Sequence, residues 1–241
     1  MSDDADAVQA RITAFWNVLA SGYNTADNVA APGSSEYTAW LETVRSLLPE
    51  TPSDVLDVGT GTGFVAQMAA ELGHRVTGVD LAEGMLESAQ DRIERAGLDV
   101  SLLVGDAVRP PFPPASFDVV ISRSVIWTLR ELETAFRSWQ TLLRPGGRVV
   151  AIYGLGTGPM DESPAQESAE KPMGLFQRHY TAETRNALSA MRLQDHSLPI
   201  RMAQRAGLVD VTVSSLELVR GWETSPGSDL PHALVGHRLI S

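Results

Sequence analysis

The chain has 241 residues and a formal net charge of −11, and 43% of its residues are hydrophobic. This length and apolar content suit one large domain with a substantial core, whereas the negative charge argues against a nucleic-acid partner, whose phosphates are neutralised by Lys and Arg. Because the sequence contains no cysteine, it excludes disulfides, thiolate metal ligands and a cysteine nucleophile.

The N-terminal region predicts a helical segment in two parts. Helices are expected at about 5–21 and 35–48, with turn-forming Ser, Gly, Asn and Pro residues between them. The acidic N-terminus lacks the basic and apolar regions of a secretory signal. No apolar run approaches the ~20 residues of a membrane-spanning helix. We therefore expect a cytoplasmic protein with no membrane partner.

A strand pattern that runs into a glycine-rich turn is the most informative motif. The apolar run 55–58 leads into Gly59-Thr60-Gly61-Thr62-Gly63, and a helix is predicted at 63–73. Glycine allows positive φ angles and lets a ligand approach the backbone closely. The motif predicts a nucleotide-like cofactor, although an ordinary tight turn uses the same residues.

Acidic residues close the next two predicted strands. Strand 75–80 ends in Asp80, about 20 residues after Gly59, and strand 99–104 is followed by Gly105-Asp106-Ala107. A carboxylate at Asp80 can accept hydrogen bonds from both hydroxyls of a ribose, and Asp106 can accept one from an adenine amino group. Both aspartates would also suit helix N-caps. Since parallel strands end at one sheet edge, we expect both to face the same ligand.

Strands and helices alternate through the rest of the chain. The further predicted helices are 84–97, 131–143 and 197–206, and the further predicted strands are 117–121, 147–153, 209–214 and 233–240. Nearly continuous apolar strands that alternate with helices predict an α/β fold with a parallel sheet covered on both faces. The polar segment 154–181 reads as a long connection, either a lid or a disordered loop.

Over residues 53–153 these ordered motifs resemble the class I S-adenosylmethionine-dependent methyltransferases, in particular the small-molecule branch related to quinone-biosynthesis methyltransferases. The resemblance implies a Rossmann-like, doubly wound seven-stranded sheet, mostly parallel with an antiparallel last strand. It implies helices on both faces and an N-terminal helical cap. One domain over 1–241 would then comprise a cap (1–50), a cofactor-binding core (51–153), a lid or acceptor loop (154–181) and a C-terminal part (182–241).

The resemblance also implies which residues bind S-adenosylmethionine and its product S-adenosylhomocysteine. The expected cofactor-binding residues are Asp57, Gly59, Thr60, Gly61, Gly63, Asp80, Leu81, Met85, Gly105, Asp106, Ala107, Ser122 and Arg123. Met85 would pack on the adenine, although a Met on a helix is more often core filler. Ala82 departs from the family, which often has Ser there, and so loses one hydrogen bond.

The expected acceptor side combines aromatic residues with two candidate bases. The resemblance brings Trp16, Tyr23 and Trp127 to the mouth of the site, where they could stack on a flat acceptor. Trp16 would otherwise only pack its helix onto the sheet. His179 is the first candidate base and His196 the second, because imidazole titrates in the range needed to take a phenolic proton, although a His in a polar loop is more often a solvated or capping residue. No cluster with metal-ligand spacing appears, so no metal is expected.

The sequence therefore predicts a S-adenosylmethionine-dependent methyltransferase of small molecules. The expected acceptor is an aromatic or apolar metabolite, as in secondary metabolism, with oxygen slightly favoured over carbon or nitrogen. A monomer or homodimer is expected. Two alternatives stay open, a non-catalytic cofactor-binding partner subunit and a nicotinamide-dependent oxidoreductase. The second is disfavoured because Phe64 breaks the Gly-x-Gly-x-x-Gly spacing.

Overall fold

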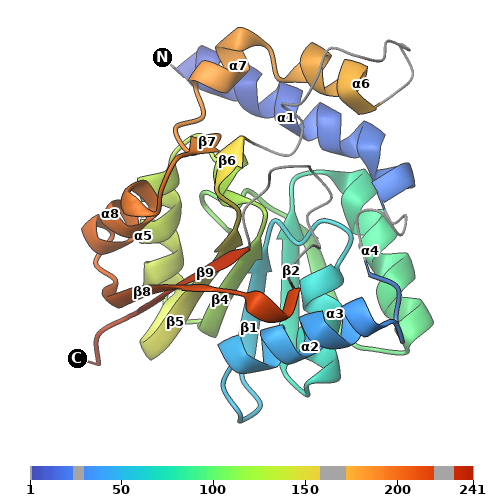
Figure 1. Ribbon diagram of the computed structural model, residues 1–241, viewed down its shortest axis with the longest axis vertical. Helices are drawn as coiled ribbons and strands as arrows, with labels where there is room; N and C mark the ends of the chain where they lie inside the picture. Colours follow the sequence, from blue (N-terminus) through green and yellow to red (C-terminus); the bar gives the residue numbers. More distant parts are fainter. Residues whose placement is uncertain (1, 24–29, 158–171, 220–230, 241) are drawn as a thin grey trace.

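The computed structural model describes residues 2–23, 30–157, 172–219 and 231–240. Its centre is a seven-stranded sheet in the order β3-β2-β1-β4-β5-β9-β8 (Figure 1). The strands are β1 (Asp54–Val58), β2 (Arg75–Asp80), β3 (Val100–Val104), β4 (Phe117–Arg123), β5 (Leu143–Tyr153), β8 (Val209–Ser215) and β9 (His232–His237). Strands β1 to β5 pair in parallel, and β9 is antiparallel to both β5 and β8. The predicted Rossmann-like sheet with an antiparallel last strand is confirmed.

Helices cover both faces of this sheet. Helices α2 (Ser35–Leu47), α3 (Phe64–Glu71) and α4 (Glu83–Ala96) lie on one face, and α5 (Leu132–Leu142) and α8 (Ser197–Arg205) lie on the other (Figure 1). Because successive strand residues point to opposite faces, Val119 and Ile121 pack with α2 and α3, whereas Val120 joins the cluster under α5. The central strands of the sheet, such as β1 and β4, are thus buried on both sides.

A third helical group lies across the carboxyl ends of the parallel strands. It consists of α1 (Ser2–Tyr23), α6 (Pro172–His179) and α7 (Ala182–Asn186) (Figure 1). Helices α1 and α6, the residues on either side of α7 and the short helix η1 (Ile126–Thr128) share an apolar cluster in which Phe15, Trp127 and Tyr180 are buried. We call α1, α6 and α7 the cap. Its own core holds it over the sheet edge at which the candidate cofactor residues lie.

The structure corrects the prediction of a loop at 154–181. Pro172–His179 form α6, and the two-residue strands β6 (Gly156–Thr157) and β7 (Arg192–Leu193) pair with each other, while 158–171 lie outside the described residues. The local composition is polar, and α6 is stabilised because Phe176 is buried against α1. No described helix is both long and apolar enough to cross a bilayer.

Candidate functional site

A cleft lies between helix α1 of the cap and the carboxyl ends of β1 to β4, and its empty space, including the part open to solvent, is about 970 Å³. Every residue predicted to bind the cofactor lines it except Gly63 and Ser122. The lining includes Trp16 and Tyr23 of the predicted acceptor residues, but neither Trp127 nor His179. The tertiary structure therefore brings one sheet edge and one helix of the cap together around a single space.

Gly59 and Gly61 of the glycine turn form the floor of the cleft, and each is needed there for a different reason. Gly59 has a φ of +65°, and a Cβ at this position would lie 2.5 Å from a methyl group of Val125. Gly61 has a φ of +55°, and a Cβ would meet no atom within 4 Å. Because Gly61 lines the cleft, this free space is room for a ligand against the backbone.

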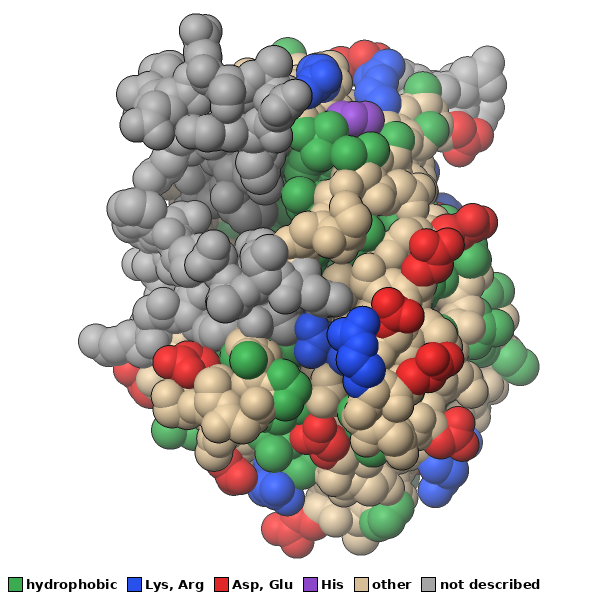
Figure 2. All heavy atoms as spheres, turned by 90° about the vertical axis from the view of Figure 1, so that its right-hand side faces the viewer, with side chains coloured by type: hydrophobic (Ala, Val, Ile, Leu, Met, Phe, Trp, Pro, Cys, Tyr) green, Lys and Arg blue, Asp and Glu red, His purple; other side chains and the backbone are tan. Residues whose placement is uncertain are grey.

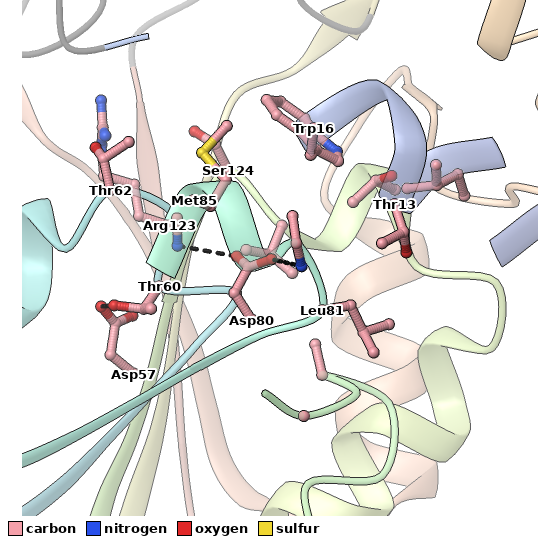
Figure 3. A pocket seen from close by; sticks show the side chains of 18 of the residues that line it. Thr13, Trp16, Asp57, Thr60, Thr62, Asp80, Leu81, Met85, Arg123 and Ser124 are labelled. Carbon is pink, nitrogen blue, oxygen red and sulfur yellow. Dashed lines mark hydrogen bonds between the residues drawn. The ribbon is translucent and has the colours of Figure 1, made fainter. Parts of the chain in front are cut away.

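The Asp80 carboxylate connects the turn after β1 with the end of β2. One oxygen accepts a hydrogen bond from the Gly61 N–H and the other from the Ala82 N–H, both at 2.9 Å (Figure 3). Burial raises the pKa of Asp80, and these backbone N–H groups oppose the rise. An ionised carboxylate has about four acceptor sites, so Asp80 can accept further hydrogen bonds from a ligand in the cleft.

The buried Asp57 side chain holds the glycine turn through a hydrogen bond with Thr60. Its side chain is 2% exposed and accepts a hydrogen bond of 2.7 Å from the Thr60 hydroxyl. Burial raises the pKa of Asp57 to about 7, although the hydrogen bond from Thr60 lowers it. The carboxyl group is thus poised to change charge near neutral pH while it holds the cofactor-side turn in place.

Asp106 occupies the equivalent place after β3. One of its oxygens accepts a hydrogen bond of 2.8 Å from the Val108 N–H, and the other accepts one of 3.0 Å from the Arg130 guanidinium. Sequence reasoning missed Arg130, because this contact spans 24 residues and no local pattern signals it. The carboxylate is therefore held in one orientation at the cleft wall.

At the end of β4, some residues line the cleft and others are buried in the protein core. Arg123 lines the cleft, and its guanidinium carbon lies 4.6 Å from the ring centre of Trp40 and 4.9 Å from that of Phe64. Ser122 is fully buried, and its hydroxyl has no hydrogen-bond partner among the described residues. Ser124 lines the cleft with a φ of +56°, a strained conformation of the kind that clusters at functional sites.

Helix α1 supplies a wall that the sequence analysis did not foresee in full. Gln9, Ile12, Thr13 and Trp16 line the cleft, and Figure 3 shows Thr13 and Trp16 extending from α1 on the side away from Asp57. Their spacing of three, four and seven residues is that of one helix face, a signal that was present in the sequence. Only the tertiary structure shows what this face covers.

The other aromatic prediction has a different environment. Trp127 is 7% exposed and belongs to the apolar cluster of the cap, with its ring centre 5.5 Å from that of Tyr180 and 6.1 Å from that of Trp16. It lies behind Trp16 rather than among the lining residues. A role of Trp127 in acceptor binding stays a prediction, and in this structure it would act through Trp16.

The candidate base lies in the cap as well. His179 Nδ1 is 3.1 Å from the carbonyl oxygen of Arg11 on α1, and His179 is not among the lining residues. His196 has its Nδ1 2.8 Å from the Tyr153 hydroxyl. In the described part of the chain, no group of three or more His, Asp or Glu could hold a metal ion. The role of His179 as a base stays a prediction.

Comparison with known proteins gives a consistent family. Residues 56–151 match the family model described as a methyltransferase domain. The chain is 37% identical over 107 residues to a demethylmenaquinone methyltransferase of Thermus thermophilus, and the aligned part covers 44% of this chain and 49% of that protein. It is 31% identical over 181 residues to phosphoethanolamine N-methyltransferase 2 of Caenorhabditis elegans, with 73% of this chain and 41% of that protein covered. The chain thus spans about half the length, or less, of these curated relatives.

A solved structure extends the likeness of fold over most of the chain. The geranyl diphosphate C-methyltransferase of Streptomyces coelicolor, determined with Mg²⁺, geranyl diphosphate and S-adenosylhomocysteine, superposes with a TM-score of 0.61 at 20% identity. The superposition covers 88% of this chain and 87% of that one. At this identity the match concerns the fold.

Proposed function

We propose that this chain, whose residues 56–151 form a class I S-adenosylmethionine-dependent methyltransferase domain, transfers a methyl group from that cofactor to a small apolar or aromatic acceptor. One observation carries the proposal: the glycine turn, Asp80 and Asp106 line the same cleft as the apolar side chains of Ile12 and Trp16 on α1. A cofactor wall and an apolar wall thus share one space, as methyl transfer between two bound molecules requires.

The residues present fit the cofactor. Gly61 leaves the turn open to the cleft, and Asp80 keeps acceptor capacity beyond its two backbone hydrogen bonds. Asp80 would bind the ribose hydroxyls, Asp106 the adenine amino group and Arg123 the carboxylate of the methionine part. When bound, S-adenosylmethionine supplies a methyl group already activated by its sulfonium sulfur. The protein's contribution is then chiefly position, which can lower a barrier by about 7–11 kcal/mol.

The acceptor class follows from the opposite wall. Ile12 and Trp16 of α1 give it an apolar surface, which Val125 and Leu129 after β4 extend toward the glycine turn, and the hydroxyls of Thr13 and Thr128 add polar points for orientation. Such a mixture of apolar lining and few polar groups suits a small organic molecule. On the described part of the face shown in Figure 2, acidic and basic side chains are interspersed, and the basic ones do not form a continuous patch. This pattern supports a small acceptor over a polyanion.

Oxygen is the acceptor atom that we propose to test first. The described residues that line the cleft include neither His nor Lys, so the bases at hand there are the carboxylates of Asp57, Asp80 and Asp106, which already accept hydrogen bonds from the protein. A phenol or enol of moderate acidity is already partly ionised in water and needs no general base. A less acidic nucleophile depends on a base that removes its proton. The relatives differ in this respect, since an N- and a C-methyltransferase are both among them.

Calorimetric titration with S-adenosylhomocysteine tests the proposal. Micromolar binding is expected, followed by a screen of phenols, enols and amines for a mass gain of one methyl group. A folded protein that binds no S-adenosylhomocysteine would overturn the methyltransferase proposal and favour the nicotinamide alternative. Binding without turnover on any acceptor class would instead favour a non-catalytic partner subunit.

The proposed base has a separate test. If His179 takes the acceptor proton, His179→Gln should lower turnover by about 10²-fold or more and remove a limb of the pH profile. A loss of less than about threefold, with an unchanged pH profile, would leave His179 with a structural role in its contacts with Arg11 and Phe15.

A further inference from the structure

A chain of side-chain hydrogen bonds crosses from the sheet edge to the cap. The Arg130 guanidinium donates to Asp106 at 3.0 Å through Nη2 and to the Gln9 side-chain oxygen at 2.7 Å through Nε. The Gln9 amide nitrogen then donates to the Thr13 hydroxyl at 3.2 Å. Asp106, Gln9 and Thr13 all line the cleft, whereas Arg130 stands behind them. One cation therefore holds a residue from each of the two walls.

Burial distinguishes this ion pair from those on the surface. The side chain of Arg130 is 11% exposed and that of Asp106 is 28% exposed. The neighbouring Arg109, which pairs with Glu131, is 57% exposed. Exposed pairs contribute little because water and salt screen them, but a shielded pair with fixed geometry is costly to break from one side. The contact between Arg130 and Asp106 is thus built into the wall.

The chemistry of arginine explains why this residue type is needed. A guanidinium presents donors in a rigid planar fork, so one side chain can serve a carboxylate and an amide oxygen in two directions. A lysine ammonium at the same position would keep the charge without this geometry. Both Asp106 and Gln9 would lose their shared hydrogen-bond donor if Arg130 were replaced by an apolar residue.

We infer that Arg130 is a positioning residue that couples cofactor binding at Asp106 to the docking of α1 against the cleft. The inference rests on the proposed function for the identity of the ligand. Arg130 fixes the Asp106 carboxylate for the adenine edge, and through Gln9 it fixes the face of α1 that carries Thr13 and Trp16. Binding of the cofactor at the sheet edge and the position of the acceptor wall on α1 thereby depend on the same side chain.

The experiment measures affinity and local exchange in the same variants. In Arg130→Met, the Kd for S-adenosylhomocysteine should rise about tenfold. Hydrogen exchange of the α1 amides without ligand should be faster by a similar factor of about ten, while exchange in α8 stays unchanged. Arg130→Lys should show the same α1 effect. Arg109→Met is the matched control, since it removes an equal charge nearby, and it should change the Kd by less than about threefold.

Each outcome decides the matter. Weaker binding with unchanged α1 exchange would overturn the coupling and leave Arg130 with Asp106 alone, and no change in either quantity would overturn the inference entirely. If Arg130→Met unfolds, Gln9→Ala serves instead, and unchanged α1 exchange in that variant overturns the inference. If the native protein binds no S-adenosylhomocysteine, the proposed function fails, but the α1 exchange of the variants still tests the docking role.

Discussion

The carboxylate of Asp80 and the N–H of Gly61 lie 2.9 Å apart, so the end of β2 holds the turn that follows β1. This contact joins the acid and the glycine turn that the sequence offered as separate motifs. It also means that Asp80 has a structural task in addition to its proposed contact with ribose. Variants must therefore distinguish loss of binding from loss of the turn.

Replacing Asp80 should weaken cofactor binding more than it weakens the fold. Asp80→Asn keeps one oxygen for a backbone N–H but loses the charge that favours the ribose hydroxyls. We expect the Kd for S-adenosylhomocysteine to rise at least about tenfold, measured by calorimetry. Asp91→Asn on α4 is the control, because Asp91 is 66% exposed and pairs with Arg95. Equal affinities for the two variants would contradict the assignment.

Two glycines separate the cost of backbone strain from the cost of crowding. Gly97 and Gly59 both have a φ of +65°, but a Cβ at Gly97 meets nothing within 4 Å, whereas one at Gly59 meets Val125. Gly97→Ala should cost about 1–2 kcal/mol in the free energy of unfolding, and Gly59→Ala about 1–3 kcal/mol more. Urea denaturation measures both, and Val125→Ala should relieve only the second. Equal costs would show that Val125 moves aside freely.

Gly61 gives the binding counterpart of that comparison. Its added Cβ would also meet no atom within 4 Å, so Gly61→Ala should cost about as much stability as Gly97→Ala, about 1–2 kcal/mol. The new methyl group lies in the cleft, and we expect the Kd for S-adenosylhomocysteine to rise about tenfold. Unchanged affinity in a stable Gly61→Ala protein would place the cofactor elsewhere.

Helix α4 begins without a side-chain cap of its own, and α1 provides one. Ala82 is the N-cap residue, and the Gly84 N–H donates instead to the Asn17 side-chain oxygen at 2.9 Å. Asn17→Ala should cost about 1 kcal/mol. Ala82→Ser would supply a local cap, so it should stabilise the Asn17→Ala protein more than the native one. Identical effects of Ala82→Ser in both backgrounds, measured by urea denaturation, would exclude this relation.

Asp57 should make stability depend on pH in a defined direction. Its pKa rises from the ordinary 3.8 to about 7 in the folded protein, so the folded state holds a proton that the unfolded state has released. The stabilising contribution is complete below about pH 3.8 and is lost as the pH rises to about 7. Between about pH 5 and pH 8, Asp57→Asn should therefore lose less stability than the native protein. Parallel urea midpoints would contradict the raised pKa.

The sequence by itself determined the sheet and its cofactor edge. Apolar strands such as 55–58 and 117–121 are buried on both faces, so a local pattern was enough to locate them. The glycines and Asp80 were also readable, because their positions depend on backbone geometry within one strand and turn. Strand boundaries agreed within a few residues, except that β5 begins at Leu143 rather than near 147.

Only the tertiary structure decided which residues face the cleft from the cap. The amphipathic spacing of Gln9, Ile12, Thr13 and Trp16 could equally serve a core, and α6 is a helix because Phe176 is buried by residues far away in the chain. Arg130 meets Asp106 and Gln9 across 24 and 121 residues. Contacts of this kind leave no periodic trace in sequence, since their energy comes from packing and from shielding of charge once the fold has formed.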